Sequence, residues 1–346
     1  MNTAITDTVP KPATAIHSIS GKRRFRHLPR IMVIGGAGFI GSHVVEALLV
    51  KGHSVRVFDD LSTGKLQNLP LNHPDLELRI GNILDHASLR DALNDIHGCI
   101  HLAAQVSAAR SVEEPRESAL CNVLGFINVL EAARSLQLKR LVYASSAAVY
   151  GNCPNLPLVE DETPKPVNPY GLEKHVDELY ADLYFRQYGL RALGLRFFNV
   201  YGPRQDPSSP YSGVISKFLD CLSAEHAPCI FGDGSQTRDF IHVRDVAQAC
   251  LVALESEYCG VCNVATGQRV NLLRMVDILS AAMDVTVTPE FAPARAGDIR
   301  HSCGSSERLQ RQLCHKPRID LELGLTELAG YYRRQSAINI TGARRF

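Results

Sequence analysis

The sequence predicts an α/β protein with a doubly wound parallel sheet and a smaller C-terminal α/β domain. Short apolar runs typical of buried strands, helical patterns between these runs, and a glycine-rich turn after the first run all indicate this class. Strands that alternate with helices form a parallel sheet covered on both faces. The 346 residues suffice for about two domains, and a net charge of +1 gives no reason to expect a nucleic-acid partner.

The first expected strand, residues 31–34, is entirely apolar and leads into the glycine-rich turn. The glycines of the turn and the apolar pair that opens the next helix are Gly35, Gly38, Phe39, Ile40 and Gly41. Gly35 allows a sharp turn, Gly38 lets a pyrophosphate approach the backbone, and Gly41 lets the helix lie close to the strand. This order is typical of a dinucleotide-binding Rossmann fold, in which the phosphates lie at the helix N-terminus.

An acidic pair after the second expected strand supports this interpretation. Residues 54–58 form that strand, and Asp59 and Asp60 follow it, roughly twenty residues after the glycines. A carboxylate at this position accepts hydrogen bonds from the adenosine ribose and would repel the additional phosphate of NADP. We therefore expect NAD, with Asp59 as the ribose ligand, while Asp60 is either a second ligand or a turn residue.

The next elements continue the alternation of strands and helices. Expected strands cover 76–80, 99–103 and 141–146, a short helix covers 88–93, and a long helix covers 113–136. Polar residues at the strand ends, such as Asn82, would point toward one crevice, because ligands of such sheets lie beyond the carboxyl ends of the strands.

A serine, a tyrosine and a lysine form a candidate catalytic set. The strand 141–146 ends at Ser146, and Pro169 opens a later helix that carries Tyr170 and Lys174 four residues apart on one face. An ammonium group near a phenol favours the phenolate, which makes the tyrosine a usable general base. A Tyr–Lys pair alone is common on solvated helices, but its place after a strand-end serine in a dinucleotide fold is far more specific.

With these motifs, the chain resembles the extended short-chain dehydrogenase/reductase family over roughly residues 30–323, and within it the NAD-dependent nucleotide-sugar 4-epimerases. The resemblance implies catalytic roles for Ser146, Tyr170 and Lys174, with Lys174 also holding the nicotinamide ribose. Asn82 stands where the family usually has aspartate. The further cofactor contacts that the resemblance implies are Asn82, Ile83, Leu102, Ala103, Asn122 and Phe197.

The second half of the chain matches the substrate motifs of the same family. By resemblance, the nucleoside diphosphate would contact Asn199, Arg238, Arg295 and Asp298. Two arginines suit this role because guanidinium groups form charge-assisted hydrogen bonds with phosphate oxygens. Ser302 lies four residues beyond Asp298, where the family places a residue near the sugar C2 substituent. A small side chain there favours UDP-N-acetylglucosamine and UDP-N-acetylgalactosamine, with UDP-glucose and UDP-galactose as further candidates.

The resemblance implies inversion at C4 through a 4-keto intermediate. Tyr170 would take the C4 hydroxyl proton, and NAD would accept the hydride and return it to the other face of the sugar. Ala147 and Ala148 occupy the places where related dehydratases and decarboxylases carry a carboxylate, which argues for simple epimerisation. Another NAD-dependent nucleotide-sugar oxidoreductase and a non-catalytic NAD-binding regulator stay open as alternatives.

The resemblance also implies a cytoplasmic homodimer, formed by the helices 113–136 and 170–189, that serves polysaccharide biosynthesis. No apolar run reaches the length of a membrane span. We expect a mobile leader over 1–29, an NAD-binding domain over 30–198, an interleaved substrate domain over 199–335, and a loose tail over 336–346. Cys259 and Cys262 have the spacing of a redox or zinc pair, but no second pair or histidine accompanies them, so we expect reduced thiols and no metal.

Overall fold

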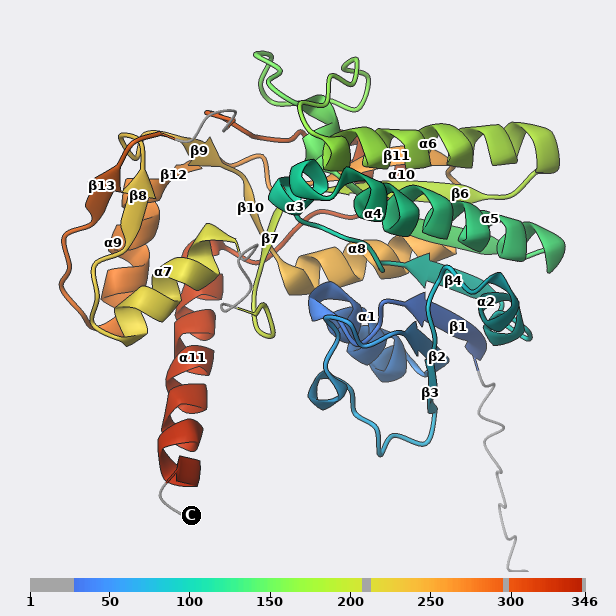
Figure 1. Cartoon of the computed structure of the whole chain (residues 1–346), viewed down its shortest axis with the longest axis horizontal. Helices are drawn as coiled ribbons and strands as arrows, with labels where there is room; N and C mark the ends of the chain where they lie inside the picture. The colour runs from blue at the N-terminus through green and yellow to red at the C-terminus, as the bar shows by residue number, and fades with distance from the viewer. Residues whose placement is uncertain (1–27, 207–212, 295–298, 344–346) are drawn as a thin grey trace, which may run out of the picture.

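The computed structural model describes residues 28–206, 213–294 and 299–343, and its centre is a seven-stranded sheet in the order β11-β6-β5-β4-β1-β2-β3 (Figure 1). Every pair of neighbouring strands in this sheet is parallel. Its strands are β1 (Leu28–Ile34), β2 (His53–Asp59), β3 (Leu76–Ile80), β4 (Gly98–His101), β5 (Arg140–Ser146), β6 (Ala192–Phe197) and β11 (Gly260–Val264). The predicted doubly wound sheet is therefore confirmed.

Helices cover both faces of this sheet. Apolar residues of α1 (Phe39–Lys51), α8 (Val243–Glu255) and α10 (Glu307–Leu313) form one core with the sheet. Residues of α2 (His86–Ala92), α5 (Gly125–Ser135) and α6 (Pro169–Tyr188) form the other core. Successive strand residues alternate between the two cores, as Val33 and Ile34 of β1 do, because side chains of a strand point to opposite faces.

A smaller α/β part lies beside the sheet, to the left in Figure 1. A third apolar core joins α7 (Val214–Ser223), α9 (Leu272–Met283) and α11 (Leu321–Ala343). Its short strands are β7 (Asn199–Tyr201), β8 (Cys229–Phe231), β9 (Thr237–Arg238), β10 (Phe240–His242), β12 (Val270–Asn271) and β13 (Glu290–Ala292). Because α8 and β11 come from the second half of the chain but belong to the large sheet, the two parts are interleaved along the sequence.

The segment predicted to be largely helical over 113–136 is helical without interruption over 115–135, so this prediction is confirmed except that the helical run begins two residues later. Its region is divided into α3 (Ala108–Glu113), α4 (Pro115–Ala119), a π-helical turn η2 (Leu120–Leu124) and α5. Glu114 leaves the helical conformation, with φ −129° and ψ 61°. Pro115 explains the break, because a proline disfavours helical geometry in the residue before it.

The two chain ends also differ from the prediction. Leu28 and Pro29 belong to β1, so the expected leader over 1–29 reaches two residues too far, and its residues 1–27 lie outside the described part. The expected loose tail over 336–346 is wrong for 336–343, which continue α11. No proline occurs in this stretch to stop the helix.

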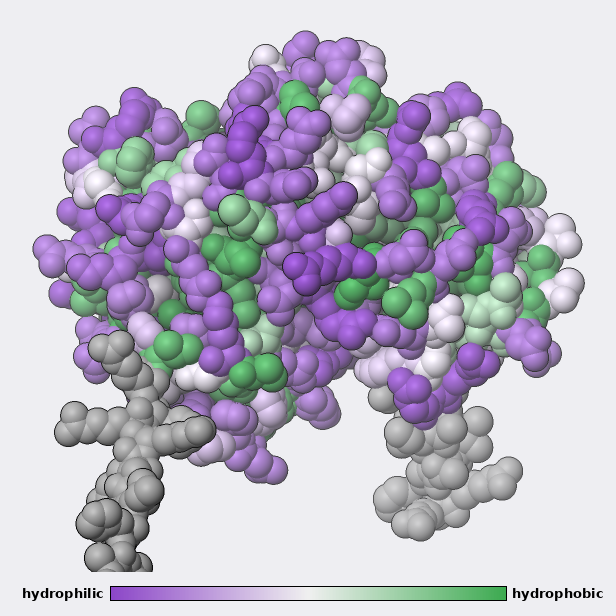
Figure 2. Space-filling view, turned by 180° about the vertical axis from the view of Figure 1, so that it is seen from behind, coloured by the Kyte–Doolittle hydropathy of each residue, from purple (hydrophilic) through white to green (hydrophobic). Residues whose placement is uncertain are grey.

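None of the described helices is long and apolar enough to cross a membrane. Figure 2 shows one face of the molecule, on which hydrophilic residues predominate and hydrophobic residues form small groups. The cysteines of the described part are unpaired thiols, and Cys262 is buried within β11 while Cys259 is half-buried. No cluster of three or more potential metal ligands occurs among the described residues.

Candidate active site

The glycine turn brings the backbone of three elements into close contact. Gly35 has a φ of +78°, and a Cβ added there would lie 2.6 Å from the amide nitrogen of Ala103, just after β4. A Cβ on Gly41 would lie 2.1 Å from the Gly35 carbonyl oxygen. Gly38 occupies the N-cap position of α1 and has no side chain to cap it. The first N–H groups of α1 are therefore left for an anion, as a dinucleotide site requires.

The acidic pair at the carboxyl end of β2 consists of an inner, buried carboxylate and an outer, exposed one. The inner one, Asp59, accepts hydrogen bonds from the backbone N–H groups of Ala37 and Leu61, each at 2.9 Å. Burial raises the pKa of Asp59. Asp60 is exposed, and its Oδ2 accepts a hydrogen bond of 2.9 Å from Asn82. Asp59 therefore braces the glycine turn, while Asp60 and Asn82 form a polar rim beside it.

The other predicted cofactor contacts lie just after β3 and β4, at the end of β6 and in η2. Leu102 and Ala103 follow β4, whose last residue is His101 rather than the predicted 103. Asn122 is buried in the π-helical turn η2, where its side chain exchanges hydrogen bonds with the backbone of Gln105. Ile83 packs against Gly125, and Phe197 ends β6 beside Ser146.

The predicted catalytic residues Ser146 and Tyr170 come from adjoining segments. Ser146 ends β5, and its Oγ accepts a hydrogen bond of 3.1 Å from Ala148 N in the short helix η3 (Ala147–Tyr150). Tyr170 lies in the first turn of α6, where its backbone N–H donates to the Ser111 hydroxyl at 3.0 Å. A Cβ on Gly171 would lie 2.6 Å from the Ala148 carbonyl oxygen. This close approach brings the start of α6 against the serine segment.

Lys174 lies one turn further along α6 and is almost fully buried. Its Nζ donates to Asp177 Oδ2 at 3.0 Å, and both side chains are at most 3% exposed. Burial opposes the charge of Lys174, but the fields of Asp177 and Tyr170 outweigh burial and raise the pKa of Lys174. The lysine is therefore an ammonium near the phenol, as the general-base hypothesis requires.

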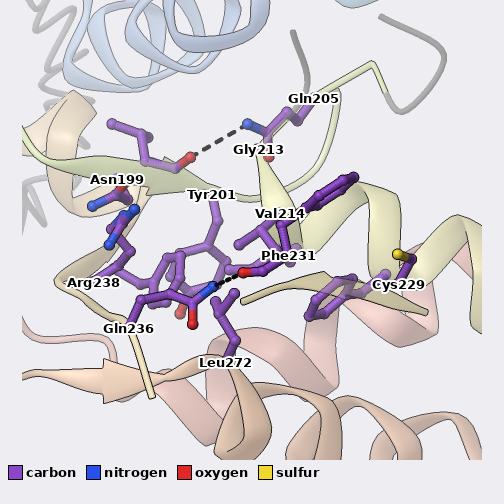
Figure 3. Close-up of a pocket in the computed structure, with 14 residues that line it drawn as sticks. Asn199, Tyr201, Gln205, Gly213, Val214, Cys229, Phe231, Gln236, Arg238 and Leu272 are labelled. Atoms are coloured by element: carbon purple, nitrogen blue, oxygen red, sulfur yellow. Dashed lines mark hydrogen bonds between the residues drawn. The ribbon is translucent and has the colours of Figure 1, made fainter. Parts of the chain in front are cut away.

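A separate pocket in the smaller part carries the predicted substrate residues Asn199 and Arg238 (Figure 3). The Arg238 guanidinium lies beside the Asn199 side chain at one end of this pocket. Arg238 Nη1 donates to its neighbour Thr237 O at 3.0 Å. Aromatic and amide side chains that sequence reasoning did not single out line the rest: Tyr201, Gln205, Phe218, Phe231, Gln236 and Phe240. One charged end and an apolar body suit a ligand with phosphates and a planar base.

Ser302 lies beside the Arg238 strand. Its backbone N–H donates to Thr237 O at 3.1 Å, and its side chain is buried. The predicted ligands Arg295 and Asp298 lie outside the described residues, so their roles stay predictions.

A buried ion pair under the catalytic serine was missed by sequence reasoning. Arg196 of β6 donates from Nε and Nη2 to the two oxygens of Glu178 on α6, each at 2.8 Å. Glu178 also accepts a bond of 2.6 Å from Ser145, the neighbour of Ser146. Burial opposes ionisation of Glu178, but Arg196 lowers its pKa. The ion pair connects α6 to β6, and the Ser145 hydrogen bond connects α6 to the end of β5. The only sign of this pair in the sequence is an acidic residue four positions after Lys174.

Comparison with known proteins gives the family of this chain. The model of the NAD dependent epimerase/dehydratase family matches residues 31–265. The chain belongs to this family. The matched region contains the glycine turn, the Ser146 segment, the Tyr170–Lys174 pair and Arg238.

Several epimerases of this family are similar to the chain over most of its length. A putative UDP-glucose 4-epimerase from Methanocaldococcus jannaschii is 38% identical over 309 residues, which are 88% of this chain and 99% of that protein. A UDP-glucose 4-epimerase from Mycolicibacterium smegmatis is 37% identical over 313 residues, which are 89% of this chain and 99% of that protein.

Solved structures of the family have the same fold. A UDP-N-acetylglucosamine 4-epimerase from Methanobrevibacter ruminantium, in complex with UDP-N-acetylmuramic acid, is 38% identical with a TM-score of 0.86 and covers 89% of this chain and 99% of that one. A Thermus thermophilus UDP-glucose 4-epimerase in complex with NAD is 35% identical with a TM-score of 0.81, and the match covers 88% of this chain and 99% of that one. These findings confirm the predicted family, the fold, an enzyme of the isomerase class and NAD as its cofactor.

The described residues of this epimerase/dehydratase fit that cofactor. The uncapped N-terminus of α1, the close approach of Gly35 to Ala103 and the buried Asp59 lie together at the carboxyl ends of β1, β2 and β4. These features suit a pyrophosphate and an adenosine ribose.

Proposed function

We propose that this enzyme inverts C4 of a UDP-hexose, with UDP-N-acetylglucosamine and UDP-N-acetylgalactosamine as its main substrates and UDP-glucose and UDP-galactose as further ones. The observation that carries the proposal is the first turn of α6, which places the half-buried Tyr170 and the buried Lys174 beside the Ser146 segment, in a chain that also holds the Arg238 pocket. The similarity to UDP-sugar 4-epimerases supports it.

Each residue has a role in this proposal. Tyr170 takes the proton from the C4 hydroxyl, and Ser146 donates its hydroxyl hydrogen to the same substrate oxygen or relays the proton. Lys174 keeps its positive charge near the phenol. NAD, when bound, accepts the C4 hydride and returns it to the opposite face of the sugar.

The nucleotide would remain fixed while the sugar turns over. We assign the pyrophosphate to Asn199, Arg238 and Arg295 and the uridine ribose to Asp298. Two guanidinium groups give charge-assisted hydrogen bonds to phosphate oxygens. These contacts would supply binding energy from a part of the substrate that does not react.

Product analysis tests this proposal directly. The purified protein is incubated with UDP-N-acetylgalactosamine or UDP-galactose without added NAD, and the C4 epimers are resolved by NMR. We expect conversion of the acetylated sugar. Conversion of UDP-galactose alone would overturn the substrate assignment. Net accumulation of NADH would identify a sugar dehydrogenase or reductase instead.

Ser302→Tyr should narrow the substrate range. A tyrosine in this buried position would fill the space that we assign to the N-acetyl group. We expect kcat/KM for UDP-N-acetylgalactosamine to fall about 100-fold, with a much smaller change for UDP-galactose. Ser302→Ala keeps the space and is the matched control. Equal losses for both sugars in the tyrosine variant would contradict the assignment and indicate a packing defect.

We further propose a homodimer formed by the α4–η2–α5 segment and α6. An apolar groove between these elements is lined by Ala119, Leu120, Val123, Ile127, Leu172 and Val176. Leu172 and Leu179 of α6 are 52% and 55% exposed, more than large apolar side chains usually are. Covering this face with a second copy would remove apolar surface from water.

Leu172→Glu should convert the dimer to a monomer, because each copy would place a carboxylate in an apolar interface. Sedimentation velocity measures the change. Val50→Glu is the control, since Val50 is 90% exposed at the end of α1. A wild-type protein that sediments as a monomer would refute the proposed interface.

A further inference from the structure

A second carboxylate beside the catalytic lysine is not used by the mechanism above. Asp177 is on α6, three residues after Lys174, so both side chains lie on one face of the helix. Asp177 Oδ2 accepts the 3.0 Å hydrogen bond from Lys174 Nζ, and Asp177 is 1% exposed. Its Oδ1 has no hydrogen-bond partner among the described residues. Asp177 is therefore a buried acid whose hydrogen bond goes to Lys174, and the mechanism above gives it no role.

Among the carboxylates around Lys174, Asp177 is the one that accepts a hydrogen bond from Lys174 Nζ. Glu173, on the preceding turn, is directed to α4 and η2 instead, and its Oε2 accepts from Ser118 of α4 at 2.8 Å and from Asn122 of η2 at 2.6 Å. Glu178 is neutralised by Arg196. The remaining titratable groups that face the pair from β4, η2 and β5 are His101, Cys121 and Tyr143.

These three groups are neutral near pH 7. Burial lowers the pKa of His101 to about 3, with help from the Lys174 charge. Burial also raises the pKa of the Cys121 thiol and of the Tyr143 phenol. Burial raises the pKa of Asp177 to about 6, against the opposing pull of Lys174. At neutral pH the buried pair therefore consists of the Lys174 ammonium and the Asp177 carboxylate.

We propose that Asp177 is a positioning residue that fixes Lys174 Nζ and offsets part of its charge, and so sets the pH at which Tyr170 becomes a base. This inference rests on the proposed role of Tyr170. One of the three N–H donors of Lys174 is committed to Asp177. The carboxylate opposes the effect of the ammonium on the phenol, because a negative charge disfavours formation of a second one nearby.

Asp177→Asn tests this directly, because the amide oxygen still accepts a hydrogen bond from Lys174 while the charge is lost. We expect the acid limb of the kcat–pH profile to move to lower pH by about one unit. KM should change little, since Asp177 is buried beneath Lys174. Asp182→Asn is the matched control: it removes an exposed carboxylate from the same helix, and its profile should coincide with that of the wild type.

A second readout does not require turnover. The tyrosinate absorbance of Tyr170 is obtained by subtracting the pH titration of each protein's Tyr170→Phe counterpart, and its midpoint should also fall by about one unit in Asp177→Asn. If the wild type is active but Asp177→Asn moves neither the acid limb of the kcat–pH profile nor the tyrosinate midpoint, the inference about Asp177 is overturned and the proposed function is retained. An inactive wild type with a shifted midpoint would overturn the proposed function but retain the role of Asp177. If Asp177→Asn does not fold, Asp177→Ser makes the same charge change with a smaller side chain and the same expected shift.

Discussion

Tyr170→Phe should lower kcat for epimerisation about a thousand-fold while the protein stays folded and retains its cofactor. The substitution removes one oxygen and keeps the ring. Tyr170 is placed by its backbone N–H, which donates to Ser111, and by the close contact of Gly171 with Ala148, and neither contact involves the phenol oxygen. The loss should therefore be confined to proton transfer at C4.

Three measurements separate this expectation from a general defect. The melting temperature and the NAD content of the purified variant should match those of the wild type, and UDP should bind with unchanged affinity. Tyr188→Phe is the control, because Tyr188 lies at the end of the same helix and is exposed. A Tyr170→Phe enzyme with more than about a tenth of the wild-type kcat would exclude Tyr170 as the general base.

The fold was predictable where the signals are local. The apolar run, the glycine turn and the helix pattern follow one another directly in the sequence, so they predicted strand, turn and helix correctly. The helical segment 113–136 was predicted correctly over 115–135, but its start was placed two residues too early because Pro115 marks a break at Glu114.

The candidate site was predictable only in part, because burial of charges depends on tertiary contacts. The run Glu173 to Glu178 has the composition of a solvated helix face. In the structure α6 lies between β5 and η2, so Glu173, Asp177 and Glu178 are buried. Each finds a partner on another element or one turn away, in Asn122, Lys174 and Arg196 respectively. The pairings of Glu173 with Asn122 and of Glu178 with Arg196 join separate elements, so no local spacing predicts them. The Lys174–Asp177 pair has the helical spacing of three residues, but the spacing alone does not show that the pair is buried.

Arg196→Met should destabilise the protein by about 3–5 kcal/mol at about pH 7, the largest stability effect that we expect from one substitution in the site. The methionine leaves Glu178 buried and without its guanidinium partner. It also removes the hydrogen bond of 2.8 Å from Arg196 to the Tyr150 hydroxyl and the stacking of the guanidinium on the Tyr150 ring. Urea unfolding followed by circular dichroism measures the change.

The pH dependence of this loss identifies its cause. In the wild type, Arg196 lowers the pKa of Glu178 against the effect of burial, so the ion pair stabilises the fold above the unfolded pKa and is lost as the pH falls. In the variant, burial without the guanidinium should raise the pKa of Glu178, so the variant loses stability as the pH rises. Because about pH 5 still lies above the unfolded pKa of a glutamate, the wild-type contribution is nearly unchanged there, and the titration of Glu178 in the variant makes the difference between the two proteins smaller at about pH 5 than at about pH 7.

Two further variants decide whether the buried charge is responsible. Adding Glu178→Gln to Arg196→Met removes the unpaired carboxylate and should recover part of the lost stability, because an isolated buried charge costs more than a neutral amide. Arg186→Met breaks the exposed pair with Asp182 on the same helix and should cost less than about 1 kcal/mol. If the loss in Arg196→Met were independent of pH and unchanged by Glu178→Gln, the destabilisation would come from packing around Tyr150, and the ion pair would not be what holds α6 against the strand that ends at Ser146.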